Sequence, residues 1–183
     1  MRLAKASPRL LPFLVLGLTG CFSLAKHPAP PSPFIGEPDA DGIRRLHHEV
    51  IAEESRSPVG EAAFTIHDQE RWSSLRPSLR IDWDDEPDID RNTVIYVSIS
   101  AGSGGYRVRV DSVFVEGGLI SAPGTRLVGG EVVVAYTVEE PGDDCMATMM
   151  TTTPYQAVVV GIAFDHDPVF LESREPYSCA GHR

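Results

Sequence analysis

The sequence is short of basic residues. Lys and Arg number 16 against 26 Asp and Glu, which gives a formal net charge of −10 at pH 7. A protein that binds nucleic acid needs a basic face against the phosphates, so nucleic acid is not an expected partner. The negative charge also repels anionic lipid surfaces, so attachment to a membrane would not depend on a basic patch.

The apolar run near the N-terminus is too short to cross a membrane. Leu10–Leu18 is broken only by one proline and one glycine, but a spanning helix needs roughly 20 apolar residues. Basic residues precede this run, at Arg2, Lys5 and Arg9. A basic start followed by a short apolar run predicts a secretory signal peptide that is later removed.

The run ends in Leu18-Thr19-Gly20-Cys21, an apolar residue and two small residues before a cysteine. This segment resembles the processing site of bacterial lipoproteins. The resemblance implies that Cys21 becomes the first mature residue and carries diacylglycerol on its sulfur. The alternative is an ordinary secretory signal with an incidental cysteine. Both readings predict export, and we expect a lipid-anchored protein of the bacterial cell envelope.

Two further expectations follow from cleavage before Cys21. Loss of residues 1–20 would leave 13 basic residues against 26 acidic ones, a net charge of −13. Phe22 would occupy the second mature position, where enteric lipoproteins of the inner membrane carry aspartate. Its presence favours the outer membrane.

Cysteine is scarce, with only three in the chain. If Cys21 carries lipid, Cys145 and Cys179 remain as a pair in an oxidising compartment, and we expect a disulfide between them. It would close a loop of about 35 residues and stabilise the fold by about 3 to 4 kcal/mol through chain entropy. The alternative is two free thiols.

The length of 183 residues suits one domain of ordinary size. We assign residues 1–20 to the signal peptide, 21–43 to a proline-rich tether, and 44–183 to a single β-rich domain. Proline favours extended backbone and cannot donate to a strand ladder, so the tether is expected to be a stiff spacer. Its prolines are Pro28, Pro30, Pro31, Pro33 and Pro38.

The body is predicted to be mainly β, as an antiparallel sandwich or barrel-like domain with one short packed helix. Several β-branched or alternating segments are separated by Gly and Pro turns. Residues 43–57 fit either a strand or a short helix. No strand is predicted after residue 162. The expected strands are 62–66, 93–100, 106–115, 119–121, 131–138 and 155–162.

A short helix is expected after Asp68, which is a suitable N-cap. It would run through Trp72 and Leu75 and end before Pro77. Trp72 and Leu75 are three residues apart, so they lie on one face and should bury it.

The glycine-rich segment Ala101-Gly102-Ser103-Gly104-Gly105 does not fit a catalytic motif. A serine nucleophile turn at Ser103 would need a helix after it, and here a strand is expected. A dinucleotide loop would need a third glycine where Arg107 stands. We therefore interpret the segment as a turn between strands, and we expect no catalytic residues and no cofactor.

Metal sites are not expected either. Asp82, Asp84, Glu86 and Asp88 alternate as in a calcium loop, but Pro87 stands where the sharp turn requires glycine, so a solvated acidic loop is favoured. Asp165-His166-Asp167 has no second ligand cluster to complete a zinc site.

Three short motifs together resemble one family. Ser103-Gly104-Gly105-Tyr106 opens a strand of alternating valines, Pro141-Gly142 follows, and Thr153-Pro154-Tyr155 enters the strand 156–161. This order is similar to that of the PrcB C-terminal domain family, named for a lipoprotein subunit of a bacterial surface protease complex. The preceding elements, Glu70-Arg71-Trp72 and Pro87-Asp88-Ile89-Asp90, fit as well. The resemblance covers about residues 61–162 and implies a non-catalytic accessory β-domain.

The chain also departs from the family pattern. Residues 143–150 lengthen the loop before Thr153, and we interpret the cysteine pair as a device that fixes this loop. A more distant likeness links three segments to chagasin-like cysteine protease inhibitors, which present three loops at one end of a sandwich. These segments are Gly105-Tyr106, Gly129-Gly130 and Thr153-Pro154-Tyr155, although the family's arginine before proline is missing.

The leading hypothesis is a lipid-anchored, exported accessory or protein-binding module associated with a surface protease or another envelope complex. The sequence does not identify the partner. Alternatives are a chagasin-like inhibitor and a purely structural envelope lipoprotein, and it stays open whether Tyr106 and Tyr155 bind a partner or pack. The candidate contact residues are Gly102, Ser103, Gly104, Gly105, Tyr106, Thr153, Pro154 and Tyr155.

Overall fold

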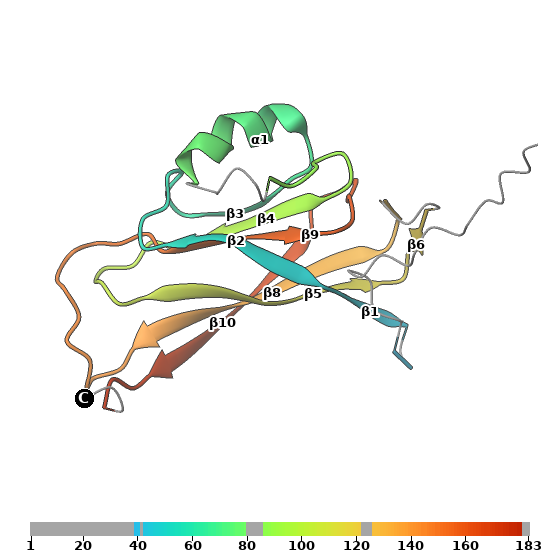
Figure 1. Cartoon of the computed structure of the whole chain (residues 1–183). Coiled ribbons are helices and arrows are strands. Elements are labelled where there is room, and N and C mark those ends of the chain that lie inside the picture. The colour runs from blue at the N-terminus through green and yellow to red at the C-terminus, as the bar shows by residue number, and fades with distance from the viewer. Residues whose placement is uncertain (1–38, 41, 80–85, 122–125, 181–183) are drawn as a thin grey trace, which may run out of the picture.

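Two four-stranded sheets pack face to face as a sandwich (Figure 1). The structure is a computed structural model and describes residues 39–40, 42–79, 86–121 and 126–180. Over these residues the sheets form a sandwich and not a closed barrel, and the prediction of a mainly β fold with one short helix is confirmed. No helix in the described ranges is long and apolar enough to span a membrane.

One sheet, which we call the open sheet, has the strand order β1-β5-β8-β10. Its pairs β1–β5 and β5–β8 are antiparallel, whereas β10 runs parallel to β8. Charged side chains cover much of its outward surface, so one face is solvated and the other is packed. The strands are β1 (Ile43–Leu46), β5 (Arg107–Glu116), β8 (Glu131–Pro141) and β10 (Val169–Tyr177).

The second sheet, which we call the covered sheet, has the order β2-β9-β4-β3, all antiparallel. Every residue of β4 is buried because the open sheet covers one face of this sheet and the helix covers the other (Figure 1). The strands are β2 (His48–Glu54), β3 (Ala62–Ile66), β4 (Thr93–Ser98) and β9 (Tyr155–Val160). A small hairpin of β6 (Leu119–Ile120) and β7 (Leu127–Val128) completes the set.

The helix α1 (Gln69–Leu75) begins where the sequence predicts. The Asp68 side chain accepts a hydrogen bond from the Arg71 N–H at 2.7 Å, which satisfies a free donor of the first turn. Trp72 and Leu75 are 0% and 7% exposed, and burial of each stabilises the fold by about 1.5 to 3 kcal/mol. The chain then continues into the 3-10 turn η1 (Arg76–Ser78).

Two features at the ends of the domain differ from the sequence prediction. Residues 43–57, left open between strand and helix, contain β1 and β2, which end at Glu54, belong to different sheets and are separated only by His47. The segment after residue 162 contains the nine-residue strand β10, which we did not predict. Its backbone pairs with β8, which is distant in the sequence, while its own side chains are mostly exposed.

Candidate functional site

The two loops proposed as a contact surface lie side by side in the structure. The first connects β4 to β5, and the second connects β8 to β9. Ala101 and Thr152 exchange backbone hydrogen bonds of 2.9 and 3.0 Å, and the Gly104 N–H donates to the Thr148 carbonyl at 2.9 Å. The Thr152 hydroxyl donates to the Ser103 carbonyl at 2.9 Å. Segments almost 50 residues apart are thus joined at one end of the sandwich.

Glycine is required at two positions of the first loop. A Cβ atom at Gly104 would collide with the Thr148 hydroxyl oxygen, so this glycine permits the close approach of the two loops. Gly105 has φ +94°, a left-handed conformation that side chains other than glycine rarely adopt. The prediction that this segment is a glycine-rich turn with positive φ between strands is confirmed.

Thr153 and Pro154, just before β9, are held between the segments that follow β2 and β4 in the covered sheet. The Thr153 N–H donates to the Ser55 carbonyl at 3.1 Å, and its own carbonyl accepts from Ser57 N–H at 2.6 Å. The Pro154 carbonyl accepts from Ile99 N–H at 3.2 Å. Both residues therefore help to fix the second loop to the body of the domain.

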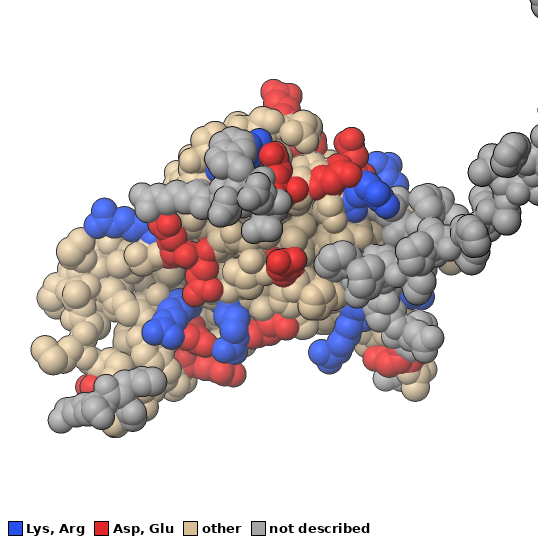
Figure 2. Space-filling view, in the orientation of Figure 1, with Lys and Arg blue, Asp and Glu red and all other residues tan. Residues whose placement is uncertain are grey.

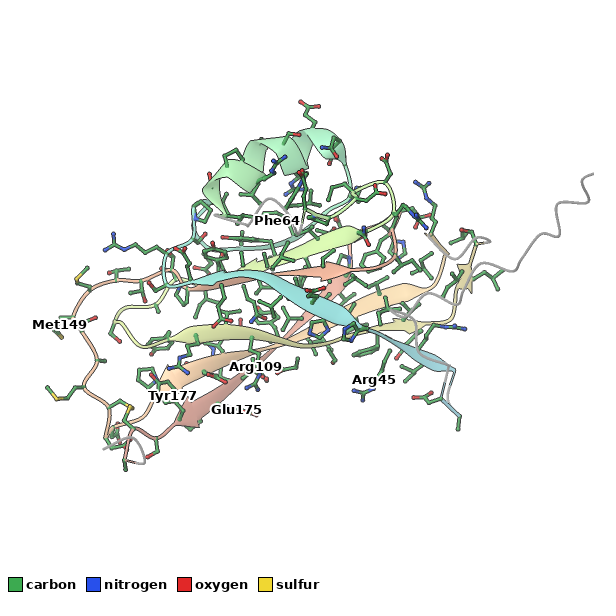
Figure 3. The ribbon with its side chains drawn as sticks, in the orientation of Figure 1. Arg45, Phe64, Arg109, Met149, Glu175 and Tyr177 are labelled. Carbon is green, nitrogen blue, oxygen red and sulfur yellow. A yellow bond between two sulfur atoms is a disulfide. The ribbon has the colours of Figure 1, made fainter. Side chains whose placement is uncertain are left out.

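The two tyrosines differ in their surroundings. Tyr155 is only 1% exposed, and its ring stacks on Tyr96 with a centroid distance of 5.2 Å. Tyr96 in turn stacks on Phe64 at 5.0 Å, under α1 (Figure 3). The Tyr155 side chain is thus a core group, while Tyr106 is half-buried against the core between the sheets.

A cleft of about 300 Å³ opens between the end of β2 and the start of β5. Two of its lining residues are joined by a hydrogen bond, in which the Tyr177 hydroxyl donates to the Gly105 carbonyl at 2.8 Å. The Arg107 guanidinium lies 5.4 Å from the centroid of the Tyr177 ring, within the range of a cation–π contact. The cleft is lined by Glu53, Glu54, Ser55, Gly105, Tyr106, Arg107, Val108, Pro154, Tyr155 and Tyr177.

The buried side chain of Gln156 makes two hydrogen bonds next to this cleft. The Gln156 side chain is 4% exposed, and its oxygen accepts from the Val110 N–H at 2.7 Å. Its nitrogen donates to the Glu53 carboxylate at 2.9 Å. Gln156 therefore joins the covered sheet to the open sheet and orients an acidic group of the cleft.

The most exposed apolar side chains of the site are three methionines that the sequence analysis did not single out. Met146, Met149 and Met150 are 102%, 98% and 55% exposed, and Met149 points away from the body of the domain (Figure 3). The same end of the molecule is largely uncharged in the view of Figure 2. Three methionines within five residues were the signal in the sequence that could have shown this surface.

The methionine loop is fixed at its base. The predicted disulfide between Cys145 and Cys179 is confirmed and ties the loop to the segment after β10. The Asp144 carboxylate accepts from the Ser178 hydroxyl at 2.7 Å and from the N–H groups of Cys179 and Ala180, both at 2.9 Å. These donors, the Ser178 hydroxyl above all, hold the pKa of Asp144 below its ordinary value.

The three-loop arrangement of the chagasin-like inhibitors is not formed. Arg107 pairs with Glu139 at one end of the β5–β8 ladder, and Glu116 pairs with Glu131 at the other. Gly129-Gly130 precedes β8 and therefore lies at the opposite end from Gly105 and Thr153, where Gly130 instead packs close to Gly117 and Gly118. The three segments follow the inhibitors' order along the chain, but the strand register places Gly129-Gly130 at the other end of the sandwich, so they do not form one three-loop surface.

In the other candidate sites, the acidic segment and the histidine motif, side chains make contacts within the domain. Glu86 accepts from Arg76 at 2.6 Å and from the Trp72 indole at 3.2 Å. His166 contacts Asp165 through Nδ1 at 2.7 Å. No group of three His, Cys, Asp or Glu side chains in the described part of the chain could hold a metal ion. Asp82, Asp84 and Cys21 lie outside the described residues.

Comparison with known proteins gives one match. No curated protein and no solved structure matches the chain significantly. The matched region runs from within β4 to just past the end of β9 and includes both paired loops and the methionines. Residues 95–161 match the family described as PrcB C-terminal, which confirms the resemblance over this region, whereas the motifs before residue 95 lie outside the match.

Proposed function

We propose that this chain is an exported, lipid-anchored accessory protein that binds a partner protein through one end of its sandwich. We call this surface the loop end and define it as residues 101–106, 142–154 and 177–180. The observation that carries the proposal is the presence of three exposed methionines on a loop that a disulfide and a hydrogen-bonded loop pair hold in place.

The energetics of the loop end suit binding. Fully exposed apolar side chains contribute little to folding, whereas burying each one against a partner would contribute about 1.5 to 3 kcal/mol. Methionine is unbranched and polarizable, and it adapts to irregular partner surfaces. Because the backbone beneath is already fixed by the Gly104–Thr148 and Ala101–Thr152 hydrogen bonds, binding would lose less conformational entropy than a free loop would.

The direction in which the chain enters the domain supports the same role. Ile43, at the start of β1, pairs with Glu116, at the end of β5 that is remote from Tyr106. A tether that ends at β1 would hold the domain by the end opposite the methionines. The loop end would then face away from the membrane, where a partner can reach it.

The nature of the partner follows from the family resemblance. A domain similar to the C-terminal part of PrcB is expected to act as a non-catalytic subunit beside a surface protease or within another envelope complex. The cleft at the same end of the sandwich, with its tyrosines and carboxylates, offers both apolar contact and hydrogen bonding. Attachment through Cys21 and location at the outer membrane are part of the same proposal.

Affinity purification from membranes of cells that produce the full chain tests the proposal. A tag placed between β6 and β7 leaves the loop end unobstructed. The triple variant Met146→Ser, Met149→Ser and Met150→Ser should recover at least about tenfold less of the co-purifying partner than the wild type. Unchanged recovery would reject the methionines as the contact surface.

A matched control distinguishes the loss of a specific contact at the methionines from the loss of exposed apolar surface in general. Leu119→Ser with Val128→Ser removes side chains that are 76% and 51% exposed at the opposite end, and it should not change partner recovery. A purely structural lipoprotein would give no stoichiometric partner with either form. Incorporation of radiolabelled palmitate, and its loss in Cys21→Ala, tests the anchor separately.

A further inference from the structure

All methionines beyond Met1 are concentrated in one loop. The chain has four, and three of them are Met146, Met149 and Met150. Methionine ordinarily fills irregular gaps in protein cores, yet both core clusters here consist of Val, Ile, Leu, Ala and aromatic residues. Met146 and Met149 therefore place their thioether groups in solvent, and Met150 is about half-exposed.

The spacing of the three residues allows their sulfur atoms to meet. A fully extended chain covers at most about 3.6 Å per residue, so the Cα atoms of Met146 and Met149 are at most about 11 Å apart. Met149 and Met150 are adjacent, and each side chain has three rotatable bonds. Since Met146 and Met149 are almost fully exposed, no neighbouring group prevents them from turning toward one another.

We propose that Met146, Met149 and Met150 together bind a soft monovalent cation, with Cu(I) as the ion of this class that a cell supplies. Thioether sulfur selects Cu(I) over harder cations. The net charge of −10 favours the approach of a cation. No redox step is involved, because the ion binds and leaves as Cu(I).

Other ligands in the loop do not compete for this ion. The Cys145 sulfur is bonded to Cys179 and is not a thiolate. The Asp144 carboxylate is occupied by three donors of the C-terminal turn, and carboxylate oxygen is a hard ligand. The disulfide at Cys145 and the Ala101–Thr152 hydrogen bonds fix the two sides of the methionine segment, and the Gly104–Thr148 hydrogen bond fixes its middle, which lowers the entropy lost when the sulfurs converge.

Methionine-methyl NMR tests the site directly. The full chain, labelled with ¹³C at the methionine methyl groups, is titrated in chloride-free buffer with Ag(I), a redox-inert soft cation, and under nitrogen with Cu(I). We expect the signals of Met146, Met149 and Met150 to shift together and to saturate at one ion per chain. Zn(II), a harder cation, should leave them unchanged.

Leucine variants separate metal binding from protein contact, because leucine keeps the apolar area and removes the sulfur. Met146→Leu should weaken Ag(I) binding by about tenfold or more, and the triple leucine variant should abolish it while partner recovery stays near wild type. Methyl signals that do not move in tenfold excess Ag(I), or equal Ag(I) affinity of the triple leucine variant, would overturn the inference. The inference does not depend on the proposed protein partner.

Discussion

Replacement of Gln156 by leucine should destabilise the domain strongly, because this side chain connects the two sheets from a position that is 4% exposed. Leucine has a similar volume, so little cavity is formed. What is lost is the acceptor for the Val110 N–H at 2.7 Å and the donor to Glu53 at 2.9 Å. Val110 lies next to an irregularity of the β5–β8 ladder, so no neighbouring strand supplies another acceptor for its N–H.

The magnitude follows from these two bonds. A buried N–H left without an acceptor costs about 1 to 3 kcal/mol, and loss of an ordinary hydrogen bond costs about 0.5 to 1.5 kcal/mol. Glu53 is exposed to solvent, so water will replace most of the second bond. We therefore expect the free energy of unfolding to fall by about 2 to 3 kcal/mol.

Urea unfolding of the oxidised protein measures this change as a lower midpoint at constant slope. Hydrogen exchange of the Val110 amide provides a local measurement and should accelerate in Gln156→Leu. The control is Gln69→Leu, on the exposed surface of α1, which should change stability by less than about 0.5 kcal/mol. A loss below that value in Gln156→Leu, or an unchanged Val110 exchange rate, would show that the Gln156 hydrogen bonds do not stabilise the contact between the sheets.

Three further predictions concern the loop end. Reduction of the Cys145–Cys179 disulfide, which spans 34 residues, should lower the free energy of unfolding by about 3 to 4 kcal/mol in urea titrations; equal midpoints with and without reductant would contradict this. The pKa of Asp144 is lowered in the folded state. The ionised carboxylate therefore contributes to the free energy of unfolding above the ordinary pKa of 3.8, and this contribution is lost as pH falls through the folded pKa. Asp144→Asn should remove this acid-side loss from the pH dependence of stability, and an unchanged profile would exclude the carboxylate as its source. Gly104→Ala should separate the paired loops and speed exchange of the Gly104-loop amides, whereas Thr148→Ala in the same chain should restore slow exchange because it removes the colliding hydroxyl; failure of the second change to restore it would point to a backbone cause.

Local signals in the sequence predicted much of the fold. Asp68, Trp72 and Leu75 defined the helix because capping and i, i+3 spacing act within one turn. The alternating valines of β5 and the β-branched run of β4 predicted strands for similar local reasons. The pairing of Cys145 with Cys179 followed from the cysteine count and the expected compartment.

Features that depend on distant contacts could not be predicted in this way. β10 is mostly exposed and carries Glu172, Arg174 and Pro176, so its sequence is typical of a tail, and only parallel pairing with β8 makes it a strand. The change of sheet at His47 depends on where β5 and β9 lie. The burial of Tyr155 arises from stacking on Tyr96, a contact that the turn motif around it does not indicate.

The candidate site was predicted in part. Motifs of one family pattern indicated the glycine-rich loop and the Thr153 loop, whereas their pairing, which depends on contacts between distant segments, was left open and is seen in the structure. The methionines were read only as part of an insertion, because loop composition alone does not tell whether side chains fold back onto the domain. Their exposure of 102% and 98% at positions 146 and 149 decides that question.

Site-specific photo-crosslinking in intact cells shows whether the loop end contacts a partner protein. A photoreactive amino acid replaces Met149 in one variant and Val128, at the opposite end and 51% exposed, in the other. We expect a discrete protein adduct from position 149 and none from position 128. No adduct from position 149, or the same adducts from both positions, would contradict the proposed contact.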